Sequence, residues 1–362
     1  MVRRKLIIDT DCGGDDAIAI MLALTAPDTD VELITIVWGN VDVDQGMENI
    51  GKLLDLYGRD IPFYCGAPGP LVGKRETVKW GGFGSDGFGD TDIPLSHRVA
   101  LQPKKHAAVA LVEFLEAIKP SEDEVYQLVT LGPLTNIALA LRINPGVFSK
   151  LGSDTTPGLV IMGGATEGKG NSGLAAEFNS HCDPEAAYMV LQHDGWKQPV
   201  QMIGWEVTVD CPMPWSFYDK LISREHTPNG RVTLKQNKTQ EFVEKIFQRL
   251  EAFTRTDAEG TKGDAGDAEV TQDVTCVVPD AVAMLVALKP ESVIESFLTY
   301  VTVELHGTET RGSTCIDWYG TEQSMRKRGR WRNCNIITRV NREAFLSAIQ
   351  GIVDFPLDGE SD

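Results

Sequence analysis

The 362-residue sequence has little that marks a secreted, disulfide-bonded or membrane protein. Its seven cysteines are scattered and show no CxxC spacing, so neither a disulfide framework nor a zinc site is predicted. No apolar run reaches the ~20 residues that a membrane helix needs, and no hydrophobic signal core follows the N-terminus. A cytoplasmic protein without membrane contact is therefore expected.

Basic residues are also few in comparison with acidic ones. The chain has 34 Lys and Arg against 52 Asp and Glu, which gives a formal net charge of -18. Such a chain repels phosphate backbones, so nucleic acid is not an expected partner. We interpret the short basic run as a solvated loop or strand edge; it comprises Arg326, Lys327, Arg328, Arg330 and Arg332.

No Pro/Ser-rich linker, heptad pattern or internal repeat divides the chain, so residues 1–362 are predicted to form a single domain. Apolar runs alternate with helical patterns. Strands are predicted at 6–8, 33–37, 126–130, 159–162 and 200–203, and helices at 15–24, 43–57 and 106–118 and after Pro133 and Pro184. This alternation predicts an α/β, Rossmann-like fold with a mostly parallel central sheet flanked by helices.

The polar stretch 255–273 is rich in Gly, Ala, Asp, Glu and Thr and lacks periodicity. It is predicted to be a flexible insertion loop, and whether it acts as a lid is left open.

Four aspartates, Asp9, Asp11, Asp15 and Asp16, lie within eight residues directly after the first predicted strand. Ligands of open parallel sheets bind at this end of a strand. Like charges so close together raise one another's pKa, and the positive end of the following helix offsets only part of the repulsion. A hard divalent cation such as Ca²⁺, which takes oxygen ligands, resolves the conflict. The alternative is a solvated, N-capping acidic turn, but a cap needs only one or two acids.

The turn Asp9–Ala19 matches the pattern DxDxGxDDxxA, and the chain thereby resembles the inosine-uridine type nucleoside hydrolases. Further blocks follow in order: Ile36–Asn40, Leu131–Asn136, Ile161–Gly164, Ala176–Asn179, Asp183–Ala187 and Pro279–Ala283. The resemblance implies a nucleoside hydrolase-like domain that uses Ca²⁺ to split ribonucleosides into ribose and free nucleobase. It also implies a role in purine or pyrimidine salvage and a homodimer or homotetramer.

The resemblance also assigns roles to single residues. Calcium ligands would be the carboxylates of Asp11, Asp16 and Asp280 and the backbone carbonyl of Leu131, with Asp11 also the general base. A vicinal diol is a good bidentate ligand for Ca²⁺, which would hold the sugar with C1′ facing the attacking water. Substrate contacts would come from Asp15 and Asn179 to ribose hydroxyls, from Asn171 and Glu177 to the 5′-hydroxyl, and from Asn40 in the same polar shell. Asp280 would also contact the substrate.

One position departs from the family pattern. Where the inosine-uridine enzymes carry a histidine as candidate acid for the departing base, this chain has Pro279, which cannot donate a proton. The base preference is therefore open. Stacking on an aromatic side chain is the alternative way to activate a purine; Phe83 and Trp80 are the leading candidates, and Trp205 and Trp318 are further ones.

Two other functions are compatible with the motif. A haloacid dehalogenase-like phosphatase would use Asp9 as nucleophile with Mg²⁺, although Gly13 stands where its motif requires Thr or Val. A catalytically weak nucleoside-binding protein would keep the calcium and ribose site, with Pro279 as the sign of lost turnover.

Overall fold

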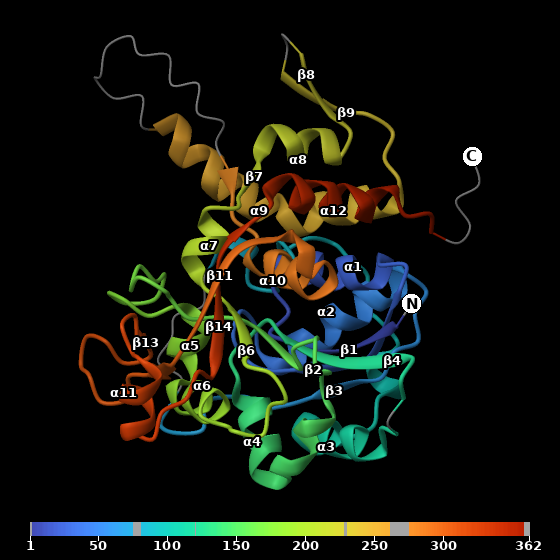
Figure 1. The fold of residues 1–362 in the computed structure, drawn as a ribbon. Coiled ribbons are helices and arrows are strands. Elements are labelled where there is room, and N and C mark those ends of the chain that lie inside the picture. The colour runs from blue at the N-terminus through green and yellow to red at the C-terminus, as the bar shows by residue number, and fades with distance from the viewer. Residues whose placement is uncertain (1, 75–80, 120, 228–229, 261–274, 358–362) are drawn as a thin grey trace, which may run out of the picture.

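The computed structural model describes residues 2–74, 81–119, 121–227, 230–260 and 275–357. A single eight-stranded sheet forms the centre of the molecule (Figure 1). In spatial order its strands are β11 (Val293–Thr299), β14 (Cys334–Val340), β6 (Val200–Ile203), β5 (Leu159–Met162), β4 (Glu124–Thr130), β1 (Arg3–Thr10), β2 (Thr29–Ile36) and β3 (Phe63–Cys65). Neighbouring strands run parallel except for the antiparallel edge pair β11–β14. The predicted mostly parallel sheet is confirmed, and the five predicted strands correspond to β1, β2, β4, β5 and β6.

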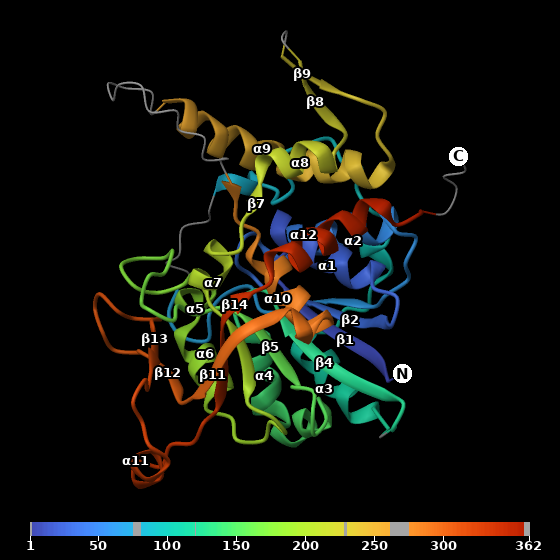
Figure 2. The ribbon, with the colours of Figure 1, turned by 45° about the horizontal axis from the view of Figure 1, so that its top comes forward.

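Helices cover both faces of this sheet (Figures 1 and 2). One face carries α1 (Gly14–Thr25), α2 (Val43–Leu56), α7 (Trp205–Val209), α10 (Pro279–Leu288) and α12 (Arg342–Asp354). The other face carries α3 (Ala107–Ala117), α4 (Thr135–Ile143) and α6 (Pro184–Leu191), which the short α5 (Phe178–Cys182) precedes. Helices α8 (Trp215–Leu221) and α9 (Lys238–Gly260) form a further layer beyond α1 and α12 (Figure 2).

The remaining strands and α-helix are small and lie outside the sheet. They are the strand pairs β7 (Met213–Pro214) with β10 (Thr275–Cys276), β8 (Arg224–Thr227) with β9 (Gly230–Thr233), and β12 (Val301–Val303) with β13 (Thr314–Ile316), and the helix α11 (Glu322–Lys327).

The layers follow from the alternation of side chains along β1. Leu6 and Ile8 face the α1 side, whereas Ile7 faces the α4 side, and all three are fully buried. A strand that is covered on both faces has apolar residues at every position, which explains its continuous hydrophobic run. The polar residues that end this strand are thereby carried to the carboxyl edge of a buried sheet.

The prediction of a loop at 255–273 is wrong for residues 255–260, because these residues belong to α9. The face of α9 at Phe242, Ile246 and Phe247 is buried. Adding turns to a helix that is already formed costs much less than starting one, so α9 extends beyond the region of apolar periodicity. Residues 261–273 lie outside the described part of the chain.

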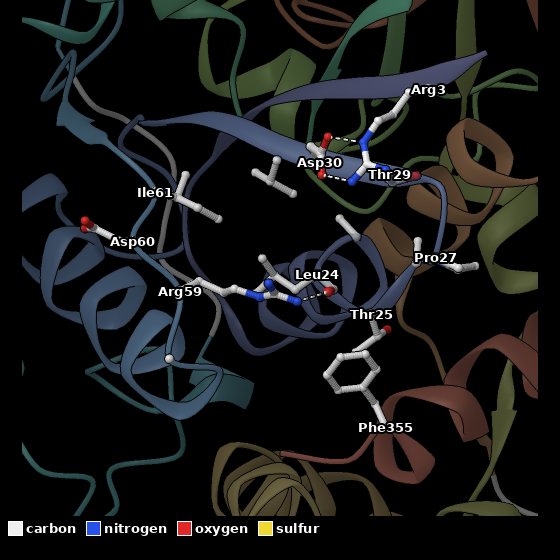
Figure 3. Close-up of a pocket in the computed structure, with 14 residues that line it drawn as sticks. Arg3, Leu24, Thr25, Pro27, Thr29, Asp30, Arg59, Asp60, Ile61 and Phe355 are labelled. Atoms are coloured by element: carbon white, nitrogen blue, oxygen red, sulfur yellow. Dashed lines mark hydrogen bonds and ion pairs between the residues drawn. The ribbon is translucent and has the colours of Figure 1, made fainter. Parts of the chain in front are cut away.

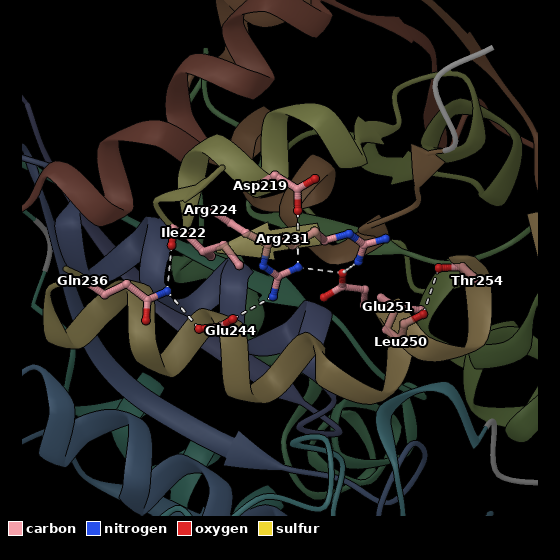
Figure 4. A network of polar contacts seen from close by, with 9 residues as sticks. All are labelled: Asp219, Ile222, Arg224, Arg231, Gln236, Glu244, Leu250, Glu251 and Thr254. Atoms are coloured by element: carbon pink, nitrogen blue, oxygen red, sulfur yellow. Dashed lines mark hydrogen bonds and ion pairs between the residues drawn. The ribbon is translucent and has the colours of Figure 1, made fainter. Parts of the chain in front are cut away.

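An ion-pair network ties the β8–β9 hairpin to α9 (Figure 4). The guanidinium of Arg224 donates to Glu251 at 2.6 Å, to Glu244 at 2.7 Å and to Asp219 at 3.3 Å. Arg231 donates to the same Glu251 oxygen at 2.7 Å. Only 10% of the Arg224 side chain is exposed, so its guanidinium is a buried positive charge held by three carboxylates, one of which, Glu251, it shares with Arg231.

We predict that Arg224→Gln lowers the free energy of unfolding by about 3–5 kcal/mol, because it removes the buried positive charge that Asp219, Glu244 and Glu251 share. Urea unfolding measures the change. The matched control is Arg231→Gln: this side chain is 39% exposed, and we expect a loss below about 1 kcal/mol. Equal losses in the two variants would contradict the prediction.

Candidate active site

The turn between β1 and α1 brings three aspartates together. The strand ends at Thr10 and the helix begins at Gly14, so Asp11 lies in the turn while Asp15 and Asp16 occupy the first helical turn. Cys12 takes a left-handed conformation with φ 62°, which side chains adopt at an energetic cost. Its carbonyl accepts from Asn49 Nδ2 at 3.1 Å and its N–H donates to Thr10 Oγ1 at 3.1 Å. These two bonds hold the sharp turn in place.

Asp11 and Asp16 are oriented by hydrogen bonds from the surrounding chain. Asp11 Oδ2 accepts the Asn40 backbone N–H at 2.7 Å, and Asp11 Oδ1 accepts Asn40 Nδ2 at 3.2 Å. Asp16 accepts the Gly13 N–H at 2.8 Å and the Thr10 hydroxyl. The structure thus brings Asn40 to the aspartates, where the sequence predicted it.

Asp280 joins the cluster from the far end of the chain. Pro279 occupies the first position of α10, where its missing N–H costs nothing, and Asp280 follows in the first turn. Carboxylate oxygens of Asp15, Asp16 and Asp280 lie within 4.8 Å of one another. The packing of α10 against α1 brings these three carboxylates together.

Burial makes this cluster electrostatically costly. Asp11, Asp15, Asp16 and Asp280 are each at most 7% exposed. Burial first and the charge of Asp16 second raise the pKa of Asp15 to about 8 and hold the pKa values of Asp11 and Asp280 well above the ordinary range. Together the carboxylates resist ionisation unless a positive charge is present.

The donor set fits a hard divalent cation. Every side-chain ligand in the cluster is a carboxylate oxygen, the kind that Ca²⁺ and Mg²⁺ prefer. Asp15 Oδ1 is buried and has no hydrogen-bond partner among the described residues, which is unfavourable for an oxygen of this kind unless a cation lies beside it. The ligands that would hold the ion are therefore contributed by the β1–α1 turn and by α10.

The end of β4 supplies a second group of polar atoms. A Cβ built on Gly132 would come within 2.9 Å of Asp11 Cβ, so Leu131 and Gly132 lie against the aspartate turn. Asn179 Nδ2 donates to the carbonyls of Leu131 at 2.9 Å and Met162 at 3.2 Å. Because both amide hydrogens are used in this way, a ribose hydroxyl at Asn179 would donate to its Oδ1.

Glu177 and Asn171 lie on the segment that connects β5 to α5. Glu177 is buried and caps α5, accepting from Asn179 N at 2.7 Å and Ser180 N at 3.0 Å. Burial raises its pKa. Asn171 is exposed, and its Oδ1 accepts the Phe178 N–H at 2.8 Å. Glu177 and Asn179 thus share one helix start, while Asn171 reaches that start from the preceding loop.

Of the predicted aromatics, Phe83 lies at the site. It ends the short helix η1 (Gly81–Phe83), and a Cβ on Gly14 would come within 2.8 Å of its ring. Phe247 of α9 packs edge-on against it with a centroid distance of 6.4 Å. Trp80 lies outside the described residues.

Trp318 does not belong to the site. It stacks on Phe297 of the edge strand β11, with ring centroids 5.0 Å apart. Five strand spacings separate β11 from β1, which is about 24 Å. Its indole therefore cannot reach a base held beside Asp11.

Asp9 is turned away from the other aspartates, which makes the phosphatase alternative wrong. It is fully buried and accepts from Thr35 Oγ1 at 2.6 Å and Asn136 Nδ2 at 2.8 Å. Burial raises its pKa to about 7. A phosphatase nucleophile must reach a phosphate, and this carboxylate supports the end of the sheet instead.

Asn49, Thr35 and Asn136 were not predicted from sequence as parts of the site. Asn49 donates to the Cys12 carbonyl and so holds the aspartate turn, whereas Thr35 and Asn136 donate to Asp9 at the end of the strand that leads into this turn. Asn136 lies in the block Leu131–Asn136 quoted above, so the sequence offered a signal for it. Asn49 and Thr35 lie in no such block, and tertiary packing alone decides which residues they contact.

A cavity of about 510 Å³ lies at the opposite end of β1 (Figure 3). Arg3, which ion-pairs with Asp30, and Arg59, which donates to the Leu24 carbonyl, line it. The length of the strand, eight residues or about 26 Å, separates this cavity from the aspartates. It is therefore not part of the aspartate site.

Comparison with known proteins identifies the class. The family model described as inosine-uridine preferring nucleoside hydrolase matches residues 6–347. The pyrimidine-specific ribonucleoside hydrolase RihA of Escherichia coli O127:H6 is 31% identical over 351 residues, 97% of this chain and 98% of the relative.

Two solved structures agree with this class. An inosine-guanosine nucleoside hydrolase is 70% identical, with a TM-score of 0.92 over 98% of this chain and 100% of that one. A purine-preferring ribonucleoside hydrolase from Gardnerella vaginalis is 26% identical, with a TM-score of 0.75 over 97% of this chain and 100% of that one.

The chain therefore belongs to the inosine-uridine preferring nucleoside hydrolase family, and it is a hydrolase that acts on ribonucleosides. This favours catalysis over the non-catalytic nucleoside-binding alternative. Among the described residues, no helix has the length and apolarity to span a bilayer.

Gly39→Ala is predicted to disable the site without unfolding the protein. A Cβ at this position would lie 1.9 Å from Asp11 Oδ2, so Asp11 must move. We expect ribose release to fall by at least about 10²-fold, since small misplacements of catalytic groups cost that much. A reducing-sugar assay with circular dichroism measures both effects. Gly69→Ala, whose Cβ meets nothing within 4 Å, is the control, and similar activity in the two variants would count against the prediction.

Proposed function

We propose that this protein is a calcium-dependent hydrolase of purine ribonucleosides, with inosine and guanosine as preferred substrates. The observation that carries the proposal is the buried, all-oxygen cluster of Asp11, Asp15, Asp16 and Asp280 at the end of β1. The base preference is supported by identity: 70% to an inosine-guanosine nucleoside hydrolase against 31% to a pyrimidine-specific relative.

In this proposal Asp11, Asp16, Asp280 and the Leu131 carbonyl hold Ca²⁺. The chemistry that the ion supplies when bound is polarisation of water and attachment of the ribose diol. Asp11 accepts the proton of the attacking water, and its carboxylate is already oriented for this by the two bonds from Asn40. Burial first and the charge of Asp16 second raise the pKa of Asp11 above that of an isolated aspartate.

The remaining polar groups orient the sugar. Asp15, Asn179 and Asp280 are assigned to ribose hydroxyls and Asn171 and Glu177 to the 5′-hydroxyl, with Asn40 in the same shell. These acceptors surround a sugar that becomes positively charged as the glycosidic bond lengthens, and buried negative groups stabilise that charge.

The leaving base needs another source of activation than residue 279, because Pro279 carries no proton. Phe83 lies at the start of α1 beside the aspartate turn, where a purine ring attached to C1′ could lie against it. A stacked purine is proposed to leave after protonation by solvent. This route suits a purine better than a pyrimidine, since a purine offers the larger stacking surface and a basic N7.

Asp11→Ala is expected to reduce ribose release from inosine by at least about 10²-fold, because it removes the general base. The isosteric Asp11→Asn should lose as much. Burial first and the charge of Asp16 second raise the pKa of Asp11, so above its unfolded-state pKa the ionisation of Asp11 opposes folding, and Asp11→Asn should melt at a higher temperature than wild type in chelator. Near wild-type turnover in either variant would refute the role.

The substrate and metal assignments are tested with inosine, guanosine, adenosine, uridine and cytidine, each assayed in chelator and after Ca²⁺ is restored. We expect kcat/KM for inosine and guanosine to exceed that for uridine and cytidine by at least about tenfold, or about 1.4 kcal/mol. Chelation should abolish ribose release and Ca²⁺ should restore it. Equal rates on purines and pyrimidines would contradict the base preference, and full activity in chelator would contradict the metal.

A homodimer or homotetramer and a role in nucleoside salvage stay predictions from the family resemblance, and a cytoplasmic location stays a prediction from the cysteine pattern and the N-terminal sequence.

A further inference from the structure

The 164–176 loop, which connects β5 to α5, carries Asn171 to the edge of the site. The loop has few side chains that pack into the core, and Asn171 itself is exposed. Gly168 and Gly173 both take left-handed conformations with φ 70°. A segment of this kind needs specific hydrogen bonds to keep one conformation.

Glu206, in the first turn of α7, supplies such bonds in the middle of the loop. Its Oε2 accepts the Thr166 N–H at 2.7 Å, and its Oε1 accepts the N–H groups of Glu167 at 2.8 Å and Lys169 at 3.2 Å. One carboxylate therefore satisfies three backbone donors of a turn. Bonds from backbone N–H groups to a charged acceptor are stronger than neutral ones.

Other contacts fix the two ends of the loop. At its start, Gly164 N donates to Glu177 at 2.8 Å, and Ala165 N donates to Thr314 Oγ1 at 2.9 Å. At its far end, Ser172 N donates to Ala176 O at 2.9 Å, and the Ser172 hydroxyl lies 3.0 Å from His181 Nδ1. Glu206 holds the stretch between these anchors, directly before Asn171.

The position of the Asn171 side chain depends on the backbone conformation of residues 166–169. Its Oδ1 is committed to the Phe178 N–H at 2.8 Å, so its Nδ2 is the atom that can donate to a substrate hydroxyl. If residues 166–169 change conformation, Gly170 and Asn171 move with them. A Cβ on Gly170 would come within 1.9 Å of the Ala176 carbonyl, which shows how closely the two sides of the loop approach.

We propose that Glu206 is a positioning residue of the hydrolase: it fixes the 164–176 loop so that Asn171 is already placed to bind the nucleoside 5′-hydroxyl. The inference rests on the proposed function for the identity of that hydroxyl. Both carboxylate oxygens of Glu206 accept from N–H groups of the loop, so Glu206 acts through Asn171 and its contribution is to substrate affinity.

The test compares wild type with Glu206→Gln on inosine and on 5′-deoxyinosine. Glutamine keeps the size but has one acceptor oxygen, so at least one loop N–H loses its partner. We expect KM for inosine to rise roughly tenfold with kcat within about threefold, because binding of the 5′-hydroxyl is remote from the bond that breaks. With 5′-deoxyinosine, which lacks the hydroxyl, the two enzymes should have the same KM.

Hydrogen exchange of residues 166–169 gives a readout that needs no turnover. Their amides should exchange at least about tenfold faster in Glu206→Gln than in wild type. Glu206→Asp restores the charge on a shorter side chain and should recover part of the affinity for inosine. The control is Glu167→Gln in the same loop, whose exposed side chain pairs with Lys169 and should change neither readout.

Unchanged exchange in Glu206→Gln, or a KM increase of equal size on both substrates, would overturn the proposal. If wild type released no ribose from any nucleoside, the proposed function would fail, whereas the exchange experiment would still report whether Glu206 holds the loop.

Discussion

Repulsion among buried carboxylates is the constraint around which this site is built. Asp11, Asp15, Asp16 and Asp280 converge where water is excluded, and their pKa values are raised because burial disfavours the charged form. Backbone and side-chain donors offset part of this cost at Asp11 and Asp16. The remaining electrostatic cost is the physical reason that a divalent cation with a preference for oxygen ligands suits the cluster. Without a bound cation, this cluster destabilises the folded protein, which indicates that its purpose is binding.

The groups around the cluster contribute by rigidity. Asn40 approaches Asp11 because Gly39 leaves room, Asn179 holds the end of β4, and Glu177 caps the helix that presents Asn179. Most of these bonds join a side chain to the backbone of a distant element, so each loop at this edge is held by another. The sugar-binding atoms are thereby oriented before substrate arrives, which is how an enzyme limits the entropy lost on binding.

Sequence patterns were sufficient to predict the parallel sheet and the location of the site. Period-two and continuous apolar runs located the parallel strands, and the acid-rich turn after β1 located the site, because ligands of open α/β sheets bind at the carboxyl ends of strands. The same rule points to Glu206, which follows β6, but its role was missed because its partners are backbone N–H groups without a sequence signature. Residues 255–260 were misjudged because helix propagation needs no apolar face.

Local sequence thus accounts for the elements, their order and the aspartate turn, since these depend on residues that are neighbours in the chain. Which residues meet across the sheet was settled only by the packed structure. The family resemblance assigned Asp280 to the cluster, but its contact with Asp15 and Asp16 comes from the packing of α10 against α1. Asp9 stays apart because it lies on the α4 side of β1, as Ile7 does, and accepts there from Asn136 of α4. Proximity between distant segments arises from the packing of whole elements, and no short stretch of sequence encodes it.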